Sequence, residues 1–326
     1  MDIMKPRALR QEARRRLEHS GNRGRQLILL NSGVLVAMTL LGNTLNFLLN
    51  HQFSATGGLG GLGMRSVLQT VQTMLSYLIA LFTPFWSAGL LFCFVALVRQ
   101  ETVENRSMLE GFRRFSKVLG FSLLGGLAGL LLVMPVAYAA SMIYTFTPFA
   151  SSFLDSVQGL VNSGALVNAA GQLDPAAIPP EVLLRGVLPL SAIMLVVAIP
   201  VFLWLHYSLH LGEYLIMTDS VRSCFQAFGR SMQMMRGQKM RMFKLDLSYW
   251  WYYLLEMIIG GILSFYMVAE LLNLALPISQ TAFYFTVLIT YCVCELGLHL
   301  WKKAERDTAY ALLYEQIADP GEALAE

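Results

Sequence analysis

The feature that most constrains this chain is a series of long apolar runs, separated by stretches that carry nearly all of its cations. About 20 consecutive apolar residues are enough to cross a bilayer as a helix. Six runs reach that length, at 27–49, 70–98, 117–145, 186–212, 247–272 and 280–301. We therefore predict an all-α fold, a polytopic membrane helix bundle of about six transmembrane helices with cytoplasmic amphipathic surface helices.

Composition supports this class. Hydrophobic residues make up 56% of the chain and charged residues only 14%, whereas a soluble domain carries about 25% charged residues. The first apolar run is too long for the core of a cleaved signal peptide, so we expect it to remain as the first span. The four cysteines lack metal-site spacing, which predicts buried thiols rather than a disulfide framework or a zinc site.

The distribution of positive charge predicts the orientation. All but two of the 24 Lys and Arg residues lie in the N-terminal segment, the loops after the second and fourth spans, or the C-terminal segment. The two exceptions are Arg65 and Arg185. Because cytoplasmic loops carry the excess of Lys and Arg, we expect a multi-pass protein of the cell membrane with both termini in the cytoplasm.

This topology divides the chain into three parts. Residues 1–26 are predicted to form a basic cytoplasmic amphipathic N-terminus, residues 27–301 the six-span domain, and residues 302–326 a cytoplasmic C-terminal tail. The outer loop 146–184 contains apolar residues at helical spacing, which predicts a short helix on the outer leaflet. The glycine run 57–63 is expected to be a flexible loop; its GxGxxG match lacks the strand-and-helix context of a nucleotide site.

The segment after the fourth span is predicted to contain an inner amphipathic helix, 219–237, capped by Asp219 and closed by Gly237. Helical spacing places its apolar residues on one face, namely Val221, Phe225, Phe228, Met232 and Met235. This helix is not expected to span the membrane, because each Lys or Arg at the bilayer centre costs about 2.5–3.5 kcal/mol.

An aromatic cluster follows this helix and precedes the fifth apolar run, as in the belts found at headgroup level. The residues predicted to lie at the membrane interface are Arg222, Arg230, Lys239, Trp250, Trp251 and Trp301. The expected partner is a bilayer with anionic inner-leaflet lipids. A membrane-protein partner or a second copy of the chain stays open, since methionine-rich faces adapt to partner helices; no nucleic acid is expected.

One region resembles a known family. The stretch "HYSLHLGEYLIMTDSVRSCFQAFGRSMQMMRGQKMRMFKLDLSYW" is similar to the characteristic segment of a bacterial integral-membrane family known as domain of unknown function 975. The positions that fit are Tyr207, Tyr214, Leu215, Ile216, Asp219, Ala227, Ser231, Met235, Gly237, Lys239, Phe243 and Ser248. Ser220-Val221 departs from the Asn-Pro-like turn expected after the acid. The resemblance implies a multi-pass membrane protein and no activity.

Two loop segments resemble each other. Residues 106–115, "RSMLEGFRRF", and 222–231, "RSCFQAFGRS", share Arg-Ser, then Glu or Gln, Gly or Ala, Phe and Arg at equal spacing. One hypothesis is a duplicated unit of helix, surface helix and helix, of the kind that builds many transporter folds. The alternative is two unrelated amphipathic helices beside the membrane.

Ionisable residues at membrane depth are the candidate functional groups. His206, His210 and Glu213 share a face of the fourth span, and Glu295 and His299 share a face of the sixth. This polar cluster could hold a metal, relay protons, or extend to the inner interface, and the last interpretation is the simplest.

No pattern of catalytic residues is present, and we expect neither an enzyme nor a cofactor. The favoured function is a non-catalytic scaffold, assembly or regulatory membrane protein. The first alternative is a small-molecule transporter that uses the His and Glu residues of the fourth and sixth spans. A weaker alternative is a metal-dependent membrane enzyme.

Overall fold

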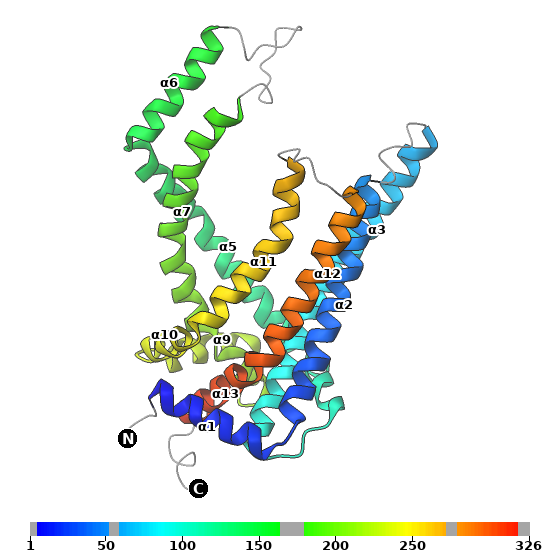
Figure 1. Cartoon of the computed structure of the whole chain (residues 1–326). Helices are drawn as coiled ribbons and strands as arrows, with labels where there is room; N and C mark the ends of the chain where they lie inside the picture. Colours follow the sequence, from blue (N-terminus) through cyan, green and yellow to red (C-terminus); the bar gives the residue numbers. More distant parts are fainter. Residues whose placement is uncertain (1–4, 52–58, 164–178, 272–278, 319–326) are drawn as a thin grey trace. The chain divides into compact units, whose positions relative to one another are not determined.

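The computed structural model describes residues 5–51, 59–163, 179–271 and 279–318, and every regular element in these ranges is a helix (Figure 1). The predicted all-α fold is therefore confirmed. The contacts divide the chain into two units, which we describe separately. The first unit contains residues 1–122 and 210–326, and the second contains residues 123–209.

The first unit holds most of the helices. In chain order they are α1 (Pro6–His19), α2 (Arg23–His51), α3 (Leu59–Val98), η1 (Asn105–Leu109), α4 (Glu110–Arg113), the start of α5 (Phe115–Thr145), α8 (Gly212–Met217), α9 (Cys224–Met234), α10 (Lys239–Ser248), α11 (Trp250–Leu271), α12 (Gln280–Leu298), η3 (His299–Lys303) and α13 (Ala304–Ala318). The second unit contains the rest of α5, together with α6 (Pro148–Asn162) and α7 (Pro180–Leu209).

Five helical stretches in the described residues are long and apolar enough to cross a membrane. They are Arg23–Phe47, Gln69–Val98, Phe115–Thr145, Arg185–Met217 and Thr281–Ala318. Each overlaps one of the predicted spans. The predicted fifth span corresponds to α11, which begins at Trp250 rather than at residue 247 and has described side chains only through Ile262. The count of six spans stays a prediction.

The first unit is built on α2, α3 and α12, which run side by side (Figure 1). Phe47 of α2 stacks on Tyr284 of α12 with ring centroids 4.4 Å apart, and Leu288 is fully buried beside them. Tyr284 also donates a hydrogen bond of 2.7 Å to the backbone oxygen of Asn43. This polar contact fixes the register of α12 against α2, since an unsatisfied hydroxyl is costly in an apolar environment.

Two glycines allow α3 to approach the η1–α4 segment closely. A Cβ atom at Gly89 would lie 1.8 Å from the backbone oxygen of Met108, and one at Gly111 would lie 2.0 Å from that of Phe85. Neither position has room for a side chain, so the backbones are in direct contact. The aromatic rings of Phe85 and Phe112 pack beside this contact, with centroids 5.4 Å apart.

In the second unit, the helix predicted within the outer loop is present as α6. It packs against α7 at Gly186, where a Cβ atom would lie 2.4 Å from the ring of Phe153. The apolar positions that predicted this helix therefore include a residue that packs on the next helix. The rest of the loop, residues 164–178, lies outside the described residues.

Two predicted loops are helices instead. Residues 59–63 of the glycine run belong to the first turns of α3, since glycine is tolerated in membrane helices; residues 57 and 58 lie outside the described part. The predicted tail also begins as a helix. The chain continues from α12 through the π-helical turn η3 into α13, whose Ala309, Ala311 and Tyr314 are almost fully buried.

The inner amphipathic helix was predicted too long and with the wrong cap. Asp219 has a φ of 53°, a left-handed conformation, and ends α8 instead of capping α9. The cap is Ser223, whose hydroxyl accepts a hydrogen bond from the amide of Gln226. Gly237, with a φ of 85°, lies between α9 and α10. The fourth span is likewise interrupted, because α7 ends at Leu209.

The buried face of α9 also differs from the predicted one. Ala227 and Ser231 are fully buried, whereas the side chain of Phe225 is 71% exposed. Small residues permit close packing, and the larger apolar ring is left on the surface. Val221 and Met235, at the two ends of the predicted face, are buried as expected.

Candidate functional site

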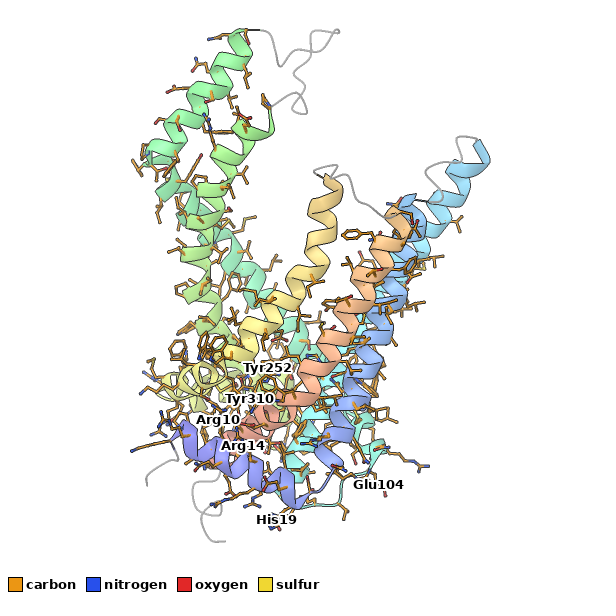
Figure 2. The ribbon with its side chains drawn as sticks, in the orientation of Figure 1. Arg10, Arg14, His19, Glu104, Tyr252 and Tyr310 are labelled. Atoms are coloured by element: carbon orange, nitrogen blue, oxygen red, sulfur yellow. The ribbon has the colours of Figure 1, made fainter. Side chains whose placement is uncertain are left out.

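The strongest cluster of polar side chains joins α1, α10, α13 and the first turn of α11, a group of elements that we call the platform (Figure 2). Its centre is the carboxylate of Glu305, which has a side chain only 9% exposed. It receives Arg10 Nε at 3.2 Å, Arg14 Nε at 3.0 Å and Lys302 Nζ at 2.9 Å. Three cations around one carboxylate fix α1 on α13.

Arg10 also ties α1 to the junction between α10 and α11. Its guanidinium donates a hydrogen bond of 2.8 Å to the backbone oxygen of Ser248 and lies 4.6 Å from the ring centroid of Tyr249. Tyr249 in turn donates to Glu305 at 3.4 Å. The hydrogen bond to Glu305 raises the pKa of Arg14 above its usual value, so the guanidinium stays charged.

A second polar group lies between α10, α11 and α13. The carboxylate of Asp246 accepts hydrogen bonds from Tyr310 and from Tyr253, the latter at 3.3 Å, and the two phenol oxygens are 2.6 Å apart. A half-buried carboxylate that accepts hydrogen bonds from two phenols is a structural arrangement, because its acceptors are already in use.

Arg306 completes the platform from α13. Its guanidinium lies 4.8 Å from the ring centroid of Tyr252 and pairs with Asp307 at 3.0 Å. A guanidinium over an aromatic face gains further stability when it is removed from water. The hydroxyl of Tyr252 is buried and has no hydrogen-bond partner.

Among the residues predicted as a polar cluster, His210 joins the platform. Its ring packs against Tyr310 and Tyr214, with centroids 5.1 Å and 5.8 Å away. Glu213 lies in the first turn of α8. His206 belongs to the second unit and contacts the ring of the adjacent Tyr207. The structure thus places these residues in aromatic surroundings.

The other two predicted residues lie on α12 and η3. His299 is buried and its Nδ1 atom is 2.9 Å from the hydroxyl of Ser32 on α2. The neighbouring Asn31 is also buried, and its side-chain oxygen lacks a hydrogen-bond partner. One turn earlier, Glu295 has one buried carboxylate oxygen, Oε2, without a partner. His299 therefore faces α2, and it fixes the π-helical turn there.

Within the described ranges, no three His, Cys, Asp or Glu side chains gather as a metal ion requires. The metal-dependent alternative needed the His and Glu residues of the fourth and sixth spans to converge. His210 instead packs on tyrosine rings, and His299 bonds to Ser32. The four cysteines are free thiols.

Most residues predicted at the membrane interface lie on the surface of the first unit. Arg222 and Arg230 of the α9 region are exposed, as are Trp250, Trp251 and Trp301, while Lys239 is half-buried. A residue at the membrane interface must be exposed on the protein surface, but exposure alone does not show that it lies there, so the interface stays a prediction.

A family of proteins described as being of unknown function, DUF975, matches residues 4–318. The chain belongs to this family. No curated protein and no solved structure is similar enough to match it.

The match covers the whole platform of this DUF975 protein, from α1 to the end of α13. Sequence reasoning missed the residues that build it, including Arg10, Arg14, Asp246 and Glu305. A signal was present in the spacing of Arg10 and Arg14, which places both on one face of α1, and in the spacing of Lys302 in η3 and Glu305 in α13. That spacing does not reveal that the two faces meet.

In this DUF975 protein, the helices that precede the two segments of the suspected repeat end in the same way. Each segment follows a helix that ends on a non-glycine residue of positive φ, Gln100 at 60° and Asp219 at 53°. The backbone hydrogen bonds that close the two helix ends have the same pattern. At the first end, Gln100 N–H donates to Leu97 O and Glu101 N–H donates to Ala96 O. At the second end, Asp219 N–H donates to Ile216 O and Ser220 N–H donates to Leu215 O. The equivalent residues Gly111 and Ala227 are both buried.

The repeat arginines also reach the same turn. Arg114 pairs with the carboxylate of Asp219 at 2.5 Å, and the equivalent Arg230 donates to the backbone oxygen of Ser220 at 3.0 Å. Lys117 adds a hydrogen bond of 3.2 Å to the backbone oxygen of Val221. The segments differ in that the first begins as the 3₁₀ turn η1 and the second is a continuous α-helix. Duplication stays a hypothesis that these shared helix ends favour.

Proposed function

We propose that this protein is a non-catalytic membrane scaffold, an assembly or regulatory component whose platform faces the cytoplasm. The observation that carries the proposal is the internal pairing of the platform. Glu305 is occupied by three cations and Asp246 by two phenols. Groups that satisfy one another make a rigid support, because such networks specify one arrangement of the elements.

The surface beside this support fits the inner leaflet of a membrane. On α10 the apolar side chains of Met240, Phe243 and Leu247 are exposed at helical spacing, and Arg241 and Lys244 are exposed between them. A basic helix with an exposed apolar face lies in the plane of an anionic interface. The proposed lipid partner is therefore the anionic inner leaflet, with the tryptophans Trp250 and Trp251 at headgroup level.

A photocrosslinking experiment in cells tests the scaffold function. A photoreactive phenylalanine analogue replaces Arg15 of α1, whose side chain is 75% exposed, or, as a matched control, Tyr77 of α3, which is 72% exposed. Scaffolding predicts a discrete protein adduct, another membrane protein or a second copy of this chain, from position 15. Adducts from position 77 alone, or from neither position, would contradict it.

A second candidate function, transport of a small molecule, is favoured by one specific observation. Within the part of the chain that the structure describes, Asn31 Oδ1 and Glu295 Oε2 are buried polar atoms of apolar helices that have no hydrogen-bond partner, and such groups often mark pathways. Uptake or proton flux in vesicles containing the purified protein tests this candidate. Flux that Glu295→Gln abolishes and Glu101→Gln preserves would support transport over scaffolding.

A further inference from the structure

A groove of about 330 Å³ lies between α2, α3, α4 and the start of α5, away from the platform's ion pairs. Every lining residue is apolar. The walls are formed by Leu41 of α2, by Leu78 and Phe82 of α3, and by Phe112 and Phe115 at the end nearest α4. All these residues belong to the first unit. A purely apolar lining offers no hydrogen bond to a polar ligand or to water.

The length of the groove matches one leaflet of a bilayer. Its lining residues on α3 run from Leu75 to Phe85. Ten residues of α-helix rise about 15 Å, which is half of the roughly 30 Å hydrocarbon thickness. An acyl chain that lies along α3 is therefore covered over the depth of one leaflet.

The volume decides between an acyl chain and a helix of another protein. A helix segment of that length, with a diameter of about 10 Å, fills roughly 1,200 Å³. The whole empty space at the groove, including its open side, is about 730 Å³, so a helix does not fit within it, whereas a single hydrocarbon chain does.

A cation follows directly after the lining residue Phe112 of α4. Arg113 falls between Phe112 and Phe115 in the sequence, and its side chain is 77% exposed. It pairs with Glu110 at 2.6 Å, but the same carboxylate also faces Arg114 at 3.6 Å. Arg114 has a closer partner in Asp219, at 2.5 Å. Because an exposed pair such as Arg113–Glu110 is weak, the Arg113 guanidinium can exchange Glu110 for a phosphate.

We propose that the groove is a phospholipid-binding site, with one acyl chain along α3 and an anionic headgroup at Arg113. The inference goes beyond scaffolding and does not depend on it, since a scaffold and a transporter could both carry a resident lipid. It assigns a ligand class to a part of the molecule that the platform does not use.

Lipid retention tests the groove. The full chain is reconstituted in vesicles of equal phosphatidylglycerol and phosphatidylethanolamine, extracted in mild detergent and weighed by native mass spectrometry. We expect the wild type to keep one phospholipid. Leu78→Trp, which fills the groove, should lose it. The matched control Leu195→Trp, on an α7 position 57% exposed against 62% for Leu78, should keep it. A wild type without lipid, or equal retention by both variants, would overturn the site.

Headgroup choice tests the cation. Arg113→Gln should retain lipid but lose the preference for phosphatidylglycerol, while Arg185→Gln, at an exposed arginine of α7, should keep that preference. Unfolding temperatures in detergent check that each variant is folded. Equal headgroup selection by wild type and Arg113→Gln would overturn the assignment of the phosphate to Arg113. A photoreactive phenylalanine analogue placed at position 78 should crosslink lipid; a crosslink to a protein instead would overturn the proposal as a whole.

Discussion

At the scale of single residues, the molecule concentrates its charge interactions on a few carboxylates. Glu305 receives Arg10, Arg14 and Lys302, and Asp219 receives Arg114 and Lys117. Isolated surface pairs contribute little to stability. The buried Glu305 carboxylate, shared by three donors, contributes more, and Asp219, with a side chain 57% exposed, gains from accepting two cations at once. These two sites therefore join segments that lie far apart in the chain.

Replacing Glu305 by Gln should loosen the platform. The amide keeps the shape of the side chain but loses the charge that three cations face, and Arg10 and Arg14 can partly rehydrate because they are 27% and 52% exposed. We expect a loss of roughly 2 kcal/mol in the free energy of unfolding. The measurement is the midpoint of thermal unfolding in detergent. The control is Glu101→Gln on an exposed residue; an equal effect in both variants would contradict the role of Glu305.

Asp219 should make stability depend on acid pH. The hydrogen bond from Arg114, followed by the nearby charges, lowers the pKa of Asp219 below its usual 3.8. A lowered folded pKa adds stability at pH values above the unfolded pKa, and this contribution disappears as pH falls through the folded pKa. Asp219→Asn keeps a residue type that accepts the left-handed conformation.

The difference in unfolding temperature between wild type and Asp219→Asn should thus be constant from pH 7 to about pH 5. It should shrink as the pH falls below the usual carboxyl pKa. A difference that stays the same down to pH 3 would show that the ion pair with Arg114 and Lys117 does not contribute.

At the scale of elements, the sequence predicts the positions of the helices more accurately than it predicts their ends. Each long apolar run is present in a helix because its composition requires burial in protein or lipid. The start of α9 was wrongly placed at Asp219, although Ser223 and Gln226 form the Ser-x-x-Gln pattern of a capping box. Asp219 and Ser223 are both suitable capping residues. Because Asp219 adopts a left-handed conformation at the end of α8, Ser223 is the residue that caps α9.

The α13 helix and the platform could not be predicted for a different reason. The segment from Ala304 to Ala318 mixes charged and apolar residues, so it resembles a solvated tail until its partners are known. Its burial depends on α1 and α3, which are distant in sequence. The same limit applies to His210 and His299, because a shared helix face does not say which helix lies opposite.

The close contact of α3 with η1 and α4 makes a prediction about glycine. Gly111→Ala places a methyl group 2.0 Å from the backbone oxygen of Phe85, so the two segments must separate, at a cost of about 1–3 kcal/mol. Gly33→Ala in α2 has no atom within 4 Å of its new methyl group and should gain helix propensity instead. Thermal unfolding in detergent measures both variants; a neutral Gly111→Ala would show that this contact is not tight.

At the scale of the whole molecule, apolar helices long enough to cross a membrane are joined to a polar platform built from α1, α10, α13 and the start of α11. Composition was sufficient to predict the long apolar helices and the all-α fold. The number of spans, their orientation and the function depend on a bilayer and on partners. The central claim is that the bases of α9 and the platform lie on the cytoplasmic side, with α6 outside.

Cysteine labelling of intact cells tests this claim most directly. In a variant whose four native cysteines are replaced by alanine, a single cysteine is placed at Arg230 in α9 or at Asp155 in α6, both exposed positions. A membrane-impermeant maleimide should label position 155 in intact cells and position 230 only after the cells are opened. Labelling of position 230 in intact cells would contradict the account.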